Sequence, residues 1–197
     1  RLRERGIATD VRTVFSAPTV AGLAEATATG PGDAVVVPVN LIGEDATVIT
    51  PDLLPLVELS QEQIDRVVAQ IPGGVANVQD IYTLAPLQEG MLFHHLMSPD
   101  SDAYVLSNLL AVDTRERLDG FLAALQTVID RHDVLRTSFH WESLPQPVQV
   151  VWRQAPLSVE QVDATVLANP VHRMDMGTAP LVRVLVAHDV ENGRWLL

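Results

Sequence analysis

Two adjacent histidines, His94 and His95, are the clearest acid–base candidates in this chain of 197 residues. Histidine changes its charge close to neutral pH, so it can accept and return a proton under ordinary conditions. The pair lies in the segment 86–97, where Pro86 suits the first turn of a helix. Neighbouring residues on a helix point about 100° apart, so both side chains cannot face one site equally. The alternative to a shared catalytic role is one buried, hydrogen-bonded histidine beside an exposed one.

A second group of charged residues lies in the segment 131–139, which reads RHDVLRTSF. Arg131, His132 and Arg136 surround Asp133 with positive or potentially positive charge. Taken by residue type alone, the segment is typical of the C-terminal end of a helix, where positive charge is favourable.

The remaining polar residues indicate neither a metal site nor a nucleophilic triad. The other histidines lack the spacing of metal ligands, the serines near them have no triad context, and the chain has no cysteine. These residues are His132, His140, His172 and His188, together with Ser98 and Ser138.

The charge of the chain argues against two classes of partner. Its 25 acidic residues outnumber its 13 lysines and arginines, which gives a formal net charge of -12. Such a surface repels phosphate backbones, so we expect no nucleic-acid binding. No apolar run is long enough to span a bilayer, so we expect no membrane partner. The lack of cysteine fits a reducing compartment, and we expect a cytoplasmic location.

The elements that must position these residues form an α/β pattern from about residue 79. The long helix has an apolar face made of Leu118, Phe121, Leu122, Leu125, Val128 and Ile129. Asn192-Gly193 lies between two apolar runs and predicts a hairpin. The expected helices are 86–97, 115–132 and a short one at 164–172; the expected strands are 103–112, 136–141, 148–153, 157–162 and the hairpin 180–197.

The part of the chain before residue 79 has a different character. Residues 1–29 predict two short helical pieces, the last turns of a helix over 1–6 and a helix over 19–27 capped by Thr19, which are too short to bury a core alone. Residues 30–57 are punctuated by proline and glycine and read as an extended inter-domain linker. Ser60 and Gln63 have the spacing of a capping box at the start of a helix over 60–71.

Three segments carry a resemblance to a known family. YTLAPLQEGMLFH at 82–94 resembles the first core motif of the condensation domains of nonribosomal peptide synthetases. RHDVLRTSF resembles their second motif, RHExLRTxF, with Asp133 in place of glutamate. HHLMSPDSD at 94–102 resembles HH[I/L]xxxxGD, a motif of dual epimerisation/condensation domains, with Ser101 in place of glycine. The resemblance implies an α/β, chloramphenicol-acetyltransferase-like N-terminal lobe, incomplete, over 58–197.

The resemblance also implies roles for individual residues. His94 and His95 become catalytic candidates, and Asp102 is the acidic residue of their motif. Arg136 is expected to support the active site by pairing with the aspartate of an HHxxxDG motif, since a guanidinium holds a carboxylate in a fixed fork. His132 is expected to be a supporting residue as well. We expect the HHxxxDG motif beyond residue 197, so the chain alone is expected to lack condensation activity.

Residues 10–24 carry a further resemblance, to the end of a peptidyl-carrier domain. Their phrase FSAPTVAGLA matches the carrier pattern F-x-x-P-T-V-x-x-L-A. This implies a carrier tail of a four-helix domain over 1–29 and a linker over 30–57. The cofactor would be 4′-phosphopantetheine, on a carrier serine expected upstream of this chain. The implied partners are upstream and downstream carrier domains, adenylation domains, and aminoacyl or peptidyl thioesters.

The implied activity has two steps, epimerisation of the carrier-bound donor residue from L to D and its condensation with the next aminoacyl group. Two alternatives stay open. One is a condensation domain without epimerase activity that takes a D-donor. The other is a non-catalytic docking platform between carrier and condensation domains.

Overall fold

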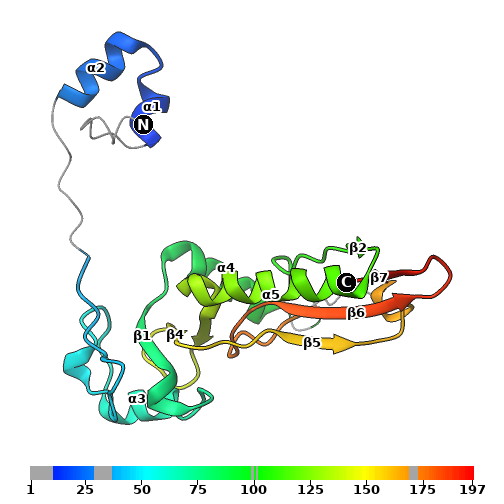
Figure 1. Ribbon diagram of the computed structural model, residues 1–197. Coiled ribbons are helices and arrows are strands. Elements are labelled where there is room, and N and C mark those ends of the chain that lie inside the picture. The colour runs from blue at the N-terminus through cyan, green and yellow to red at the C-terminus, as the bar shows by residue number, and fades with distance from the viewer. Residues whose placement is uncertain (1–10, 29–36, 99, 101, 169–172) are drawn as a thin grey trace. The chain divides into compact units, whose positions relative to one another are not determined.

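The computed structural model divides the chain into two compact units, Arg1–Val39 and Asn40–Leu197 (Figure 1). It describes residues 11–28, 37–98, 100, 102–168 and 173–197. Over residues 11–28 the first unit forms two short helices, α1 (Val11–Ser16) and α2 (Val20–Ala28). The Gly22 N–H donates to Thr19 Oγ1 over 3.1 Å, so the expected helix cap at Thr19 is confirmed. The expected helical turn at residues 1–6 lies outside the described residues.

The second unit combines helices with two small sheets. Its α-helices are α3 (Gln61–Val68), α4 (Pro86–Met97) and α5 (Arg115–Arg131). Its 3-10 turns are η2 (Pro51–Leu53), η3 (Gly74–Asn77), η4 (Asp133–Arg136) and η5 (Val166–Ala168). Its strands are β1 (Val78–Thr83), β2 (Ala111–Val112), β3 (Thr137–His140), β4 (Val148–Trp152), β5 (Ser158–Gln161), β6 (Arg183–Asp189) and β7 (Arg194–Leu196).

The two sheets differ in the direction of their strands. One sheet has the order β1-β4-β3, and both of its pairs are antiparallel. The other has the order β2-β7-β6-β5, in which β5 and β6 run parallel and the remaining pairs are antiparallel. The expected hairpin is confirmed as β6 and β7, whose turn contains Gly193 at a φ of 62°. A positive φ strains residues that carry a Cβ, which explains the glycine.

Helix α5 contributes side chains to two apolar clusters, one against each sheet. Ile129 is buried in the larger apolar cluster, with Ile64, Ile81 and Val150. Leu118 is buried in the smaller cluster, with Val184 and Val186 of β6, along which α5 runs in Figure 1. Leu125 lies between these two positions and packs against both clusters.

Residues 40–57 differ from the extended linker that their composition indicated. Ile42, Ile49, Leu54 and Val57 are buried in the larger cluster. The guanidinium of Arg153 also donates to the carbonyl oxygens of Ile42 and Gly43, over 3.0 and 2.9 Å. The segment is therefore attached to the core of the unit through these four aliphatic side chains.

Three other expectations need correction. The strand expected over 103–112 is confined to Ala111–Val112, because only its end has a partner, in β7. Phe121 and Val128, expected on the inner face of α5, are 40% and 45% exposed. The helix expected over 164–172 is the 3-10 turn Val166–Ala168 within the described residues, which exclude 169–172.

Two helix starts, in contrast, follow the expected chemistry. The Gln63 N–H donates to Ser60 Oγ over 3.3 Å, and Gln63 Oε1 accepts from the Ser60 N–H over 2.8 Å, which confirms the capping box of α3. Helix α4 begins at Pro86 and ends at Met97, the bounds that its composition indicated.

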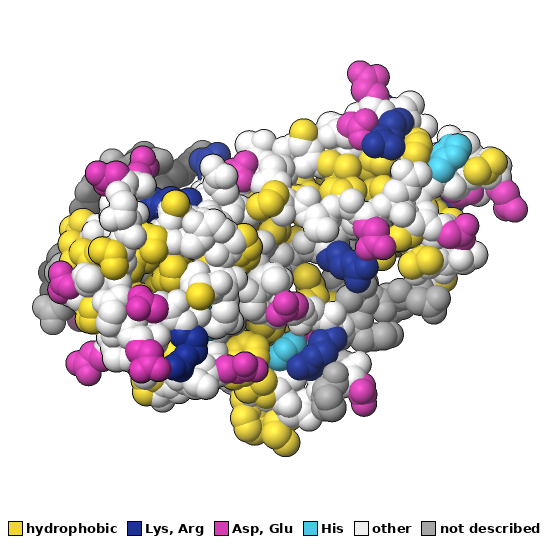
Figure 2. Space-filling view, turned by 90° about the horizontal axis from the view of Figure 1, so that it is seen from below, with side chains coloured by type: hydrophobic (Ala, Val, Ile, Leu, Met, Phe, Trp, Pro, Cys, Tyr) yellow, Lys and Arg dark blue, Asp and Glu magenta, His cyan; other side chains and the backbone are white. Residues whose placement is uncertain are grey.

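The described surface mixes acidic, basic and apolar side chains. Figure 2 shows acidic groups scattered over one face, with basic and apolar groups between them. Within the described residues, no helix is both long and apolar enough to cross a membrane.

Candidate functional site

Helix α4 carries both candidate histidines, and polar contacts fix its first turn. Gln88 Oε1 accepts from the Ala85 N–H over 2.8 Å, and the Gln88 side chain also hydrogen-bonds to Gln149 of β4. Among the residues of α4, the buried ones are Leu92 and His95. A single aliphatic side chain gives the helix little apolar attachment, so polar contacts have a large share in positioning it.

His95 and Asp102 form a close, buried pair. Nδ1 of His95 lies 2.7 Å from Oδ2 of Asp102, and each side chain is 5% exposed. The other carboxylate oxygen, Oδ1, accepts the Tyr104 backbone N–H over 2.9 Å. An ionised carboxylate only accepts hydrogen bonds, so Nδ1 of His95 carries a proton, and Nε2 is the ring nitrogen that is left to act as a base. The arrangement resembles a base held by an orienting carboxylate.

Asp102 is held in its charged form. Burial by itself raises the pKa of this carboxyl, but the Tyr104 N–H, His95 and the positive charge of Arg173 together bring the pKa below its usual value. Sequence reasoning missed Arg173, because it lies far along the chain from the motif. Ser101, the departure from the motif, lies outside the described residues.

His94 is placed differently from its neighbour. It is exposed, and its ring lies near the rings of Phe93 and Tyr104, with centroids 5.9 and 6.1 Å away. The structure therefore brings together His95 and Asp102 but not His94. One buried and one exposed histidine is the outcome expected from the helix period alone.

Arg136 occupies a buried position at the end of η4. Its Nη2 donates to Asp133 Oδ1 over 2.6 Å, and its Nη1 donates to Gln79 Oε1 over 3.1 Å and to the Trp152 carbonyl oxygen. Nε of Arg136 is buried without a hydrogen-bond partner among the described residues. In the described chain, therefore, Arg136 pairs with the aspartate of its own motif and ties η4 to β1 and β4.

His132 lies at the exposed end of α5, where its backbone supports the turn into η4. The His132 N–H donates to the Ile129 carbonyl oxygen, and the Leu135 N–H donates to the His132 carbonyl oxygen. The structure does not bring its imidazole to the His95–Asp102 pair by any hydrogen bond within the described ranges. Nor do the described residues contain a group of three or more histidine, aspartate or glutamate side chains that could hold a metal ion.

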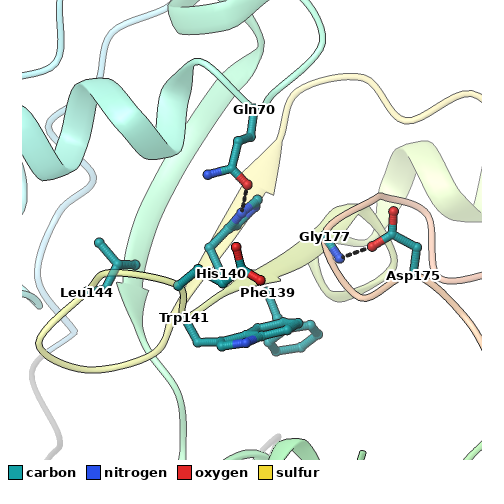
Figure 3. A pocket seen from close by; sticks show the side chains of 8 residues that line it. Gln70, Phe139, His140, Trp141, Leu144, Asp175 and Gly177 are labelled. Atoms are coloured by element: carbon teal, nitrogen blue, oxygen red, sulfur yellow. Dashed lines mark hydrogen bonds between the residues drawn. The ribbon is translucent and has the colours of Figure 1, made fainter. Parts of the chain in front are cut away.

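A small pocket lies beside β3, and sequence reasoning missed the residues around it (Figure 3). Its volume is about 170 Å³, and its lining includes Gln70, His140 and Trp141. Trp141 also meets His95 edge to face, with ring centroids 6.4 Å apart. Burial lowers the pKa of His140 to about 4, although the carboxylate of Asp175 acts in the opposite direction.

The hydrogen bonds of His140 link the buried side chain of Ser138 to the side chain of Gln70, an exposed residue. Its Nε2 lies 3.0 Å from Ser138 Oγ, and its Nδ1 lies 3.3 Å from Gln70 Oε1, the contact drawn in Figure 3. Ser138 and His140 are two residues apart on a strand, so they share one face of β3. That spacing was the available signal for their contact.

Comparison with known proteins assigns the family. The sequence profile described as "Condensation domain" matches residues 78–187, more than half of the chain. The chain belongs to the condensation-domain family of nonribosomal peptide synthetases. The expected α/β fold agrees with this family.

Relatives of this condensation domain occur among very long synthetases. Malpinin synthetase of Mortierella alpina is 47% identical over 209 residues, which cover 100% of this chain and 3% of that protein. One of the linear gramicidin synthase proteins of Brevibacillus parabrevis is 39% identical over 114 residues, covering 58% of this chain and 1% of that protein. The chain thus spans only a few per cent of the length of these relatives.

A solved structure shares the fold at low sequence identity. The crystal structure of SeMet-CT is 16% identical and has a TM-score of 0.51, with 73% of this chain and 34% of that chain covered. Within this condensation domain, the first core motif runs from β1 into α4, and the second runs from the end of α5 into β3. Both motifs therefore lie where a helix and a strand of the β1-β4-β3 sheet meet.

Proposed function

We propose that this chain is part of a dual epimerisation/condensation domain, in which His95 and Asp102 convert the carrier-bound donor residue from L to D before peptide-bond formation. The observation that carries the proposal is the 2.7 Å contact between His95 Nδ1 and Asp102 Oδ2. It joins the first part of the HHLMSPDSD motif to its last residue, as a functional unit requires.

In the epimerisation step, His95 acts as the base. Its Nε2 accepts the Cα proton of the donor residue, and the ring becomes positively charged. The carboxylate of Asp102 stabilises that charge across the Nδ1–H hydrogen bond. The electron pair of the broken C–H bond delocalises into the donor carbonyl, which makes Cα planar. After this planar group turns over in the site, Nε2 returns the proton to the opposite face of Cα, which gives the D-residue and restores the neutral ring. The exposed His94 is proposed to lie beside this step rather than to carry it.

Condensation then joins two carrier-bound groups. The amine of the downstream aminoacyl group attacks the donor carbonyl, a C–N bond forms, and the C–S bond of the thioester breaks. The amine proton leaves with the thiol. We propose that Arg136 supports this centre through its contacts with β1 and β4, and that His132 supports it through the turn into η4. The HHxxxDG motif of the family is expected outside this chain.

4′-Phosphopantetheine would supply the thioester that acidifies the Cα proton and leaves as a thiol. It is expected on a carrier serine outside this chain. Arg173, the cation near the His95–Asp102 pair, donates to backbone carbonyl oxygens and is therefore not proposed to bind the phosphate of this group. No step is therefore assigned to a residue that binds it.

The first unit is proposed to be the tail of a peptidyl-carrier domain over 1–29, joined to the condensation lobe over 58–197. The capped helix α2 supports this, because the cap Thr19 is the threonine of the carrier phrase. Malpinin synthetase supports it too, because its match extends along the whole chain, the first unit included. Upstream and downstream carriers and adenylation domains of the same synthetase are the proposed partners.

One observation favours a condensation domain without epimerase activity. The side chain of His95 is only 5% exposed, and a buried histidine that bonds a carboxylate can simply fix a loop. Such a domain would take a donor that is already in the D-form.

Two substitutions, one at each histidine, separate these functions. His95→Asn keeps a hydrogen-bond donor near the Nδ1 position but removes Nε2, so it preserves the loop and deletes the base. His94→Asn is the matched control on the neighbouring position. Each variant is made in the synthetase that contains this chain, loaded with an L-donor or a D-donor, and the configuration of the product is measured.

We expect a D-configured product from the L-donor with the unmodified protein and with His94→Asn. With His95→Asn, turnover of the L-donor falls by roughly 10²- to 10⁴-fold, the usual contribution of a general base, while the D-donor still condenses. An L-configured product from the unmodified protein refutes epimerisation. Normal epimerisation by His95→Asn refutes the assignment of the base.

A further inference from the structure

The C-terminal end of α4 is tied to a distant part of the chain. The last carbonyl groups of a helix have no donors within the helix itself. Here Arg173 Nη1 donates to the carbonyl oxygens of His95 and Ser98, over 2.8 and 2.5 Å. A positive charge at this end is also favoured by the helix dipole. One guanidinium nitrogen therefore closes the turn from which the His95 side chain extends.

The contact matters because the rest of α4 is weakly attached. Leu92 is its one buried aliphatic residue, and Gln88 holds its opposite end. Without Arg173, the turn that contains His95 would depend on the bond from His95 to Asp102 and on the ring contacts of His95 with Trp141 and of His94 with Tyr104. A loose turn would let the imidazole rotate away from the carboxylate.

Arg173 also acts on the other member of the pair. Its charge is one of the influences that lower the pKa of Asp102, beside the hydrogen bonds from Tyr104 and His95. An ionised Asp102 can only accept hydrogen bonds, so the contact favours the form of His95 that carries a proton on Nδ1. The backbone contact and the charge thus favour the same state of the imidazole.

We propose that Arg173 is the positioning residue of the His95–Asp102 pair, which holds the end of α4 in place and keeps Nε2 of His95 as the basic nitrogen. Its importance for catalysis rests on the function proposed above, but its effect on the pair does not. Both backbone contacts come from one nitrogen, so a lysine ammonium can make them and keep the charge. A methionine of similar length can do neither.

The test uses the 197-residue chain and needs no turnover. Ring nitrogen shifts of His95 at about pH 7.5 report which nitrogen is protonated, because the two tautomers differ there. The carboxyl carbon shift of Asp102 followed against pH reports its titration. The variants are Arg173→Met, Arg173→Lys and, as a matched loss of a cation elsewhere, Arg183→Met. Arg183 pairs with Glu160 across β5 and β6.

We expect the unmodified chain, Arg173→Lys and Arg183→Met to show His95 protonated at Nδ1. In Arg173→Met the ring is expected to become a mixture of both tautomers, and the titration of Asp102 to move to higher pH. A folded Arg173→Met chain with unchanged His95 and Asp102 signals overturns the proposal. If Arg173→Met does not fold, Arg173→Gln decides by the same two signals, since it keeps a donor but no charge.

The same variants in the synthetase separate this inference from the proposed function. If the signals of the pair change in Arg173→Met but the L-donor is epimerised at the normal rate, Arg173 positions the pair and the pair is not the base. If turnover falls with the signals and lysine restores both, the two proposals stand together.

Discussion

The indole N–H of Trp152 on β4 donates to Ser138 Oγ on the neighbouring strand β3, over 2.8 Å. Because this oxygen accepts from the indole, its own proton is free to point at His140 Nε2, 3.0 Å away. Nδ1 of His140 then donates to Gln70 Oε1. A neutral imidazole satisfies this chain of hydrogen bonds, whereas a charged imidazole would have to donate from both nitrogens.

Stability is therefore expected to fall with acid because of His140. Its pKa is 6.5 when unfolded and about 4 when folded, so between these values the unfolded chain binds a proton that the folded chain does not. Stability contributed by His140 is complete above pH 6.5, decreases toward pH 4 and then levels off. The loss is on the order of 3 kcal/mol, from about 1.36 kcal/mol for each pKa unit.

Urea unfolding of the unmodified chain and of His140→Gln, at about pH 7.5 and about pH 4.5, measures this contribution. The variant is expected to lose less stability on acidification than the unmodified chain. His188→Gln, an exposed position, is the control and should follow the unmodified chain. Equal losses in His140→Gln and the unmodified chain would contradict the assignment to His140.

Arg136 is expected to contribute to stability through the shape of its guanidinium. Arg136→Lys keeps the charge but cannot reach Asp133, Gln79 and the Trp152 carbonyl together. We expect a loss of about 1–3 kcal/mol in the free energy of unfolding, measured in urea, because hydrogen bonds of a buried cation are lost, including the one to the buried Trp152 carbonyl. Arg131→Lys, on the exposed end of α5, should change it by about 0.5 kcal/mol or less. A similar small change for Arg136→Lys would show that a point charge suffices.

Residues 40–57 are expected to stabilise the second unit. Ile49 is 1% exposed and its neighbour Val48 is 54% exposed, which makes them a matched pair. Ile49→Ala should lower the free energy of unfolding by about 2–5 kcal/mol, since it leaves a cavity. Val48→Ala should lower it by about 0.5 kcal/mol or less. Two equally small changes would restore the interpretation of this segment as a linker.

Asp102→Asn is expected to reduce epimerisation without changing the shape of the site. The amide fills the same space but removes the charge that stabilises a protonated His95. Turnover of an L-donor by the synthetase should fall by roughly 10²-fold, the lower end of a general-base contribution, while a D-donor condenses normally. Asp100→Asn, which changes an exposed aspartate nearby, is the control. An equal loss with both donors would mean that Asp102 supports condensation itself.

Local chemistry is enough to predict the elements whose ends are set by their own residues. Pro86 predicts the start of α4, Ser60 with Gln63 predicts that of α3, and Asn192-Gly193 predicts the β6–β7 turn. A strand, however, needs a partner that its own residues do not identify. The apolar run at 103–112 therefore predicts one long strand, although only its last residues pair with β7.

In the candidate site, too, the residues of one local motif were predictable, whereas a contact from a distant part of the chain was not. The motif pointed to His94, His95 and Asp102, and the helix period indicated that the two histidines do not face one site equally. The contribution of Arg173 depends on the tertiary fold, which brings it to α4 from another part of the sequence. The contact of Ser138 with His140 was within reach of strand periodicity, but each residue looked ordinary by itself.

Because α5 contributes buried side chains to both apolar clusters, it also couples the two sheets during unfolding. Leu118 and Ile129 are separated by eleven positions, or about 16 Å along a helix that rises about 1.5 Å per residue. The two sheets share no strand, yet unwinding α5 exposes the interior of both. Cooperativity between them is therefore built into one helix, and residues 40–197 should melt in a single calorimetric transition rather than sheet by sheet.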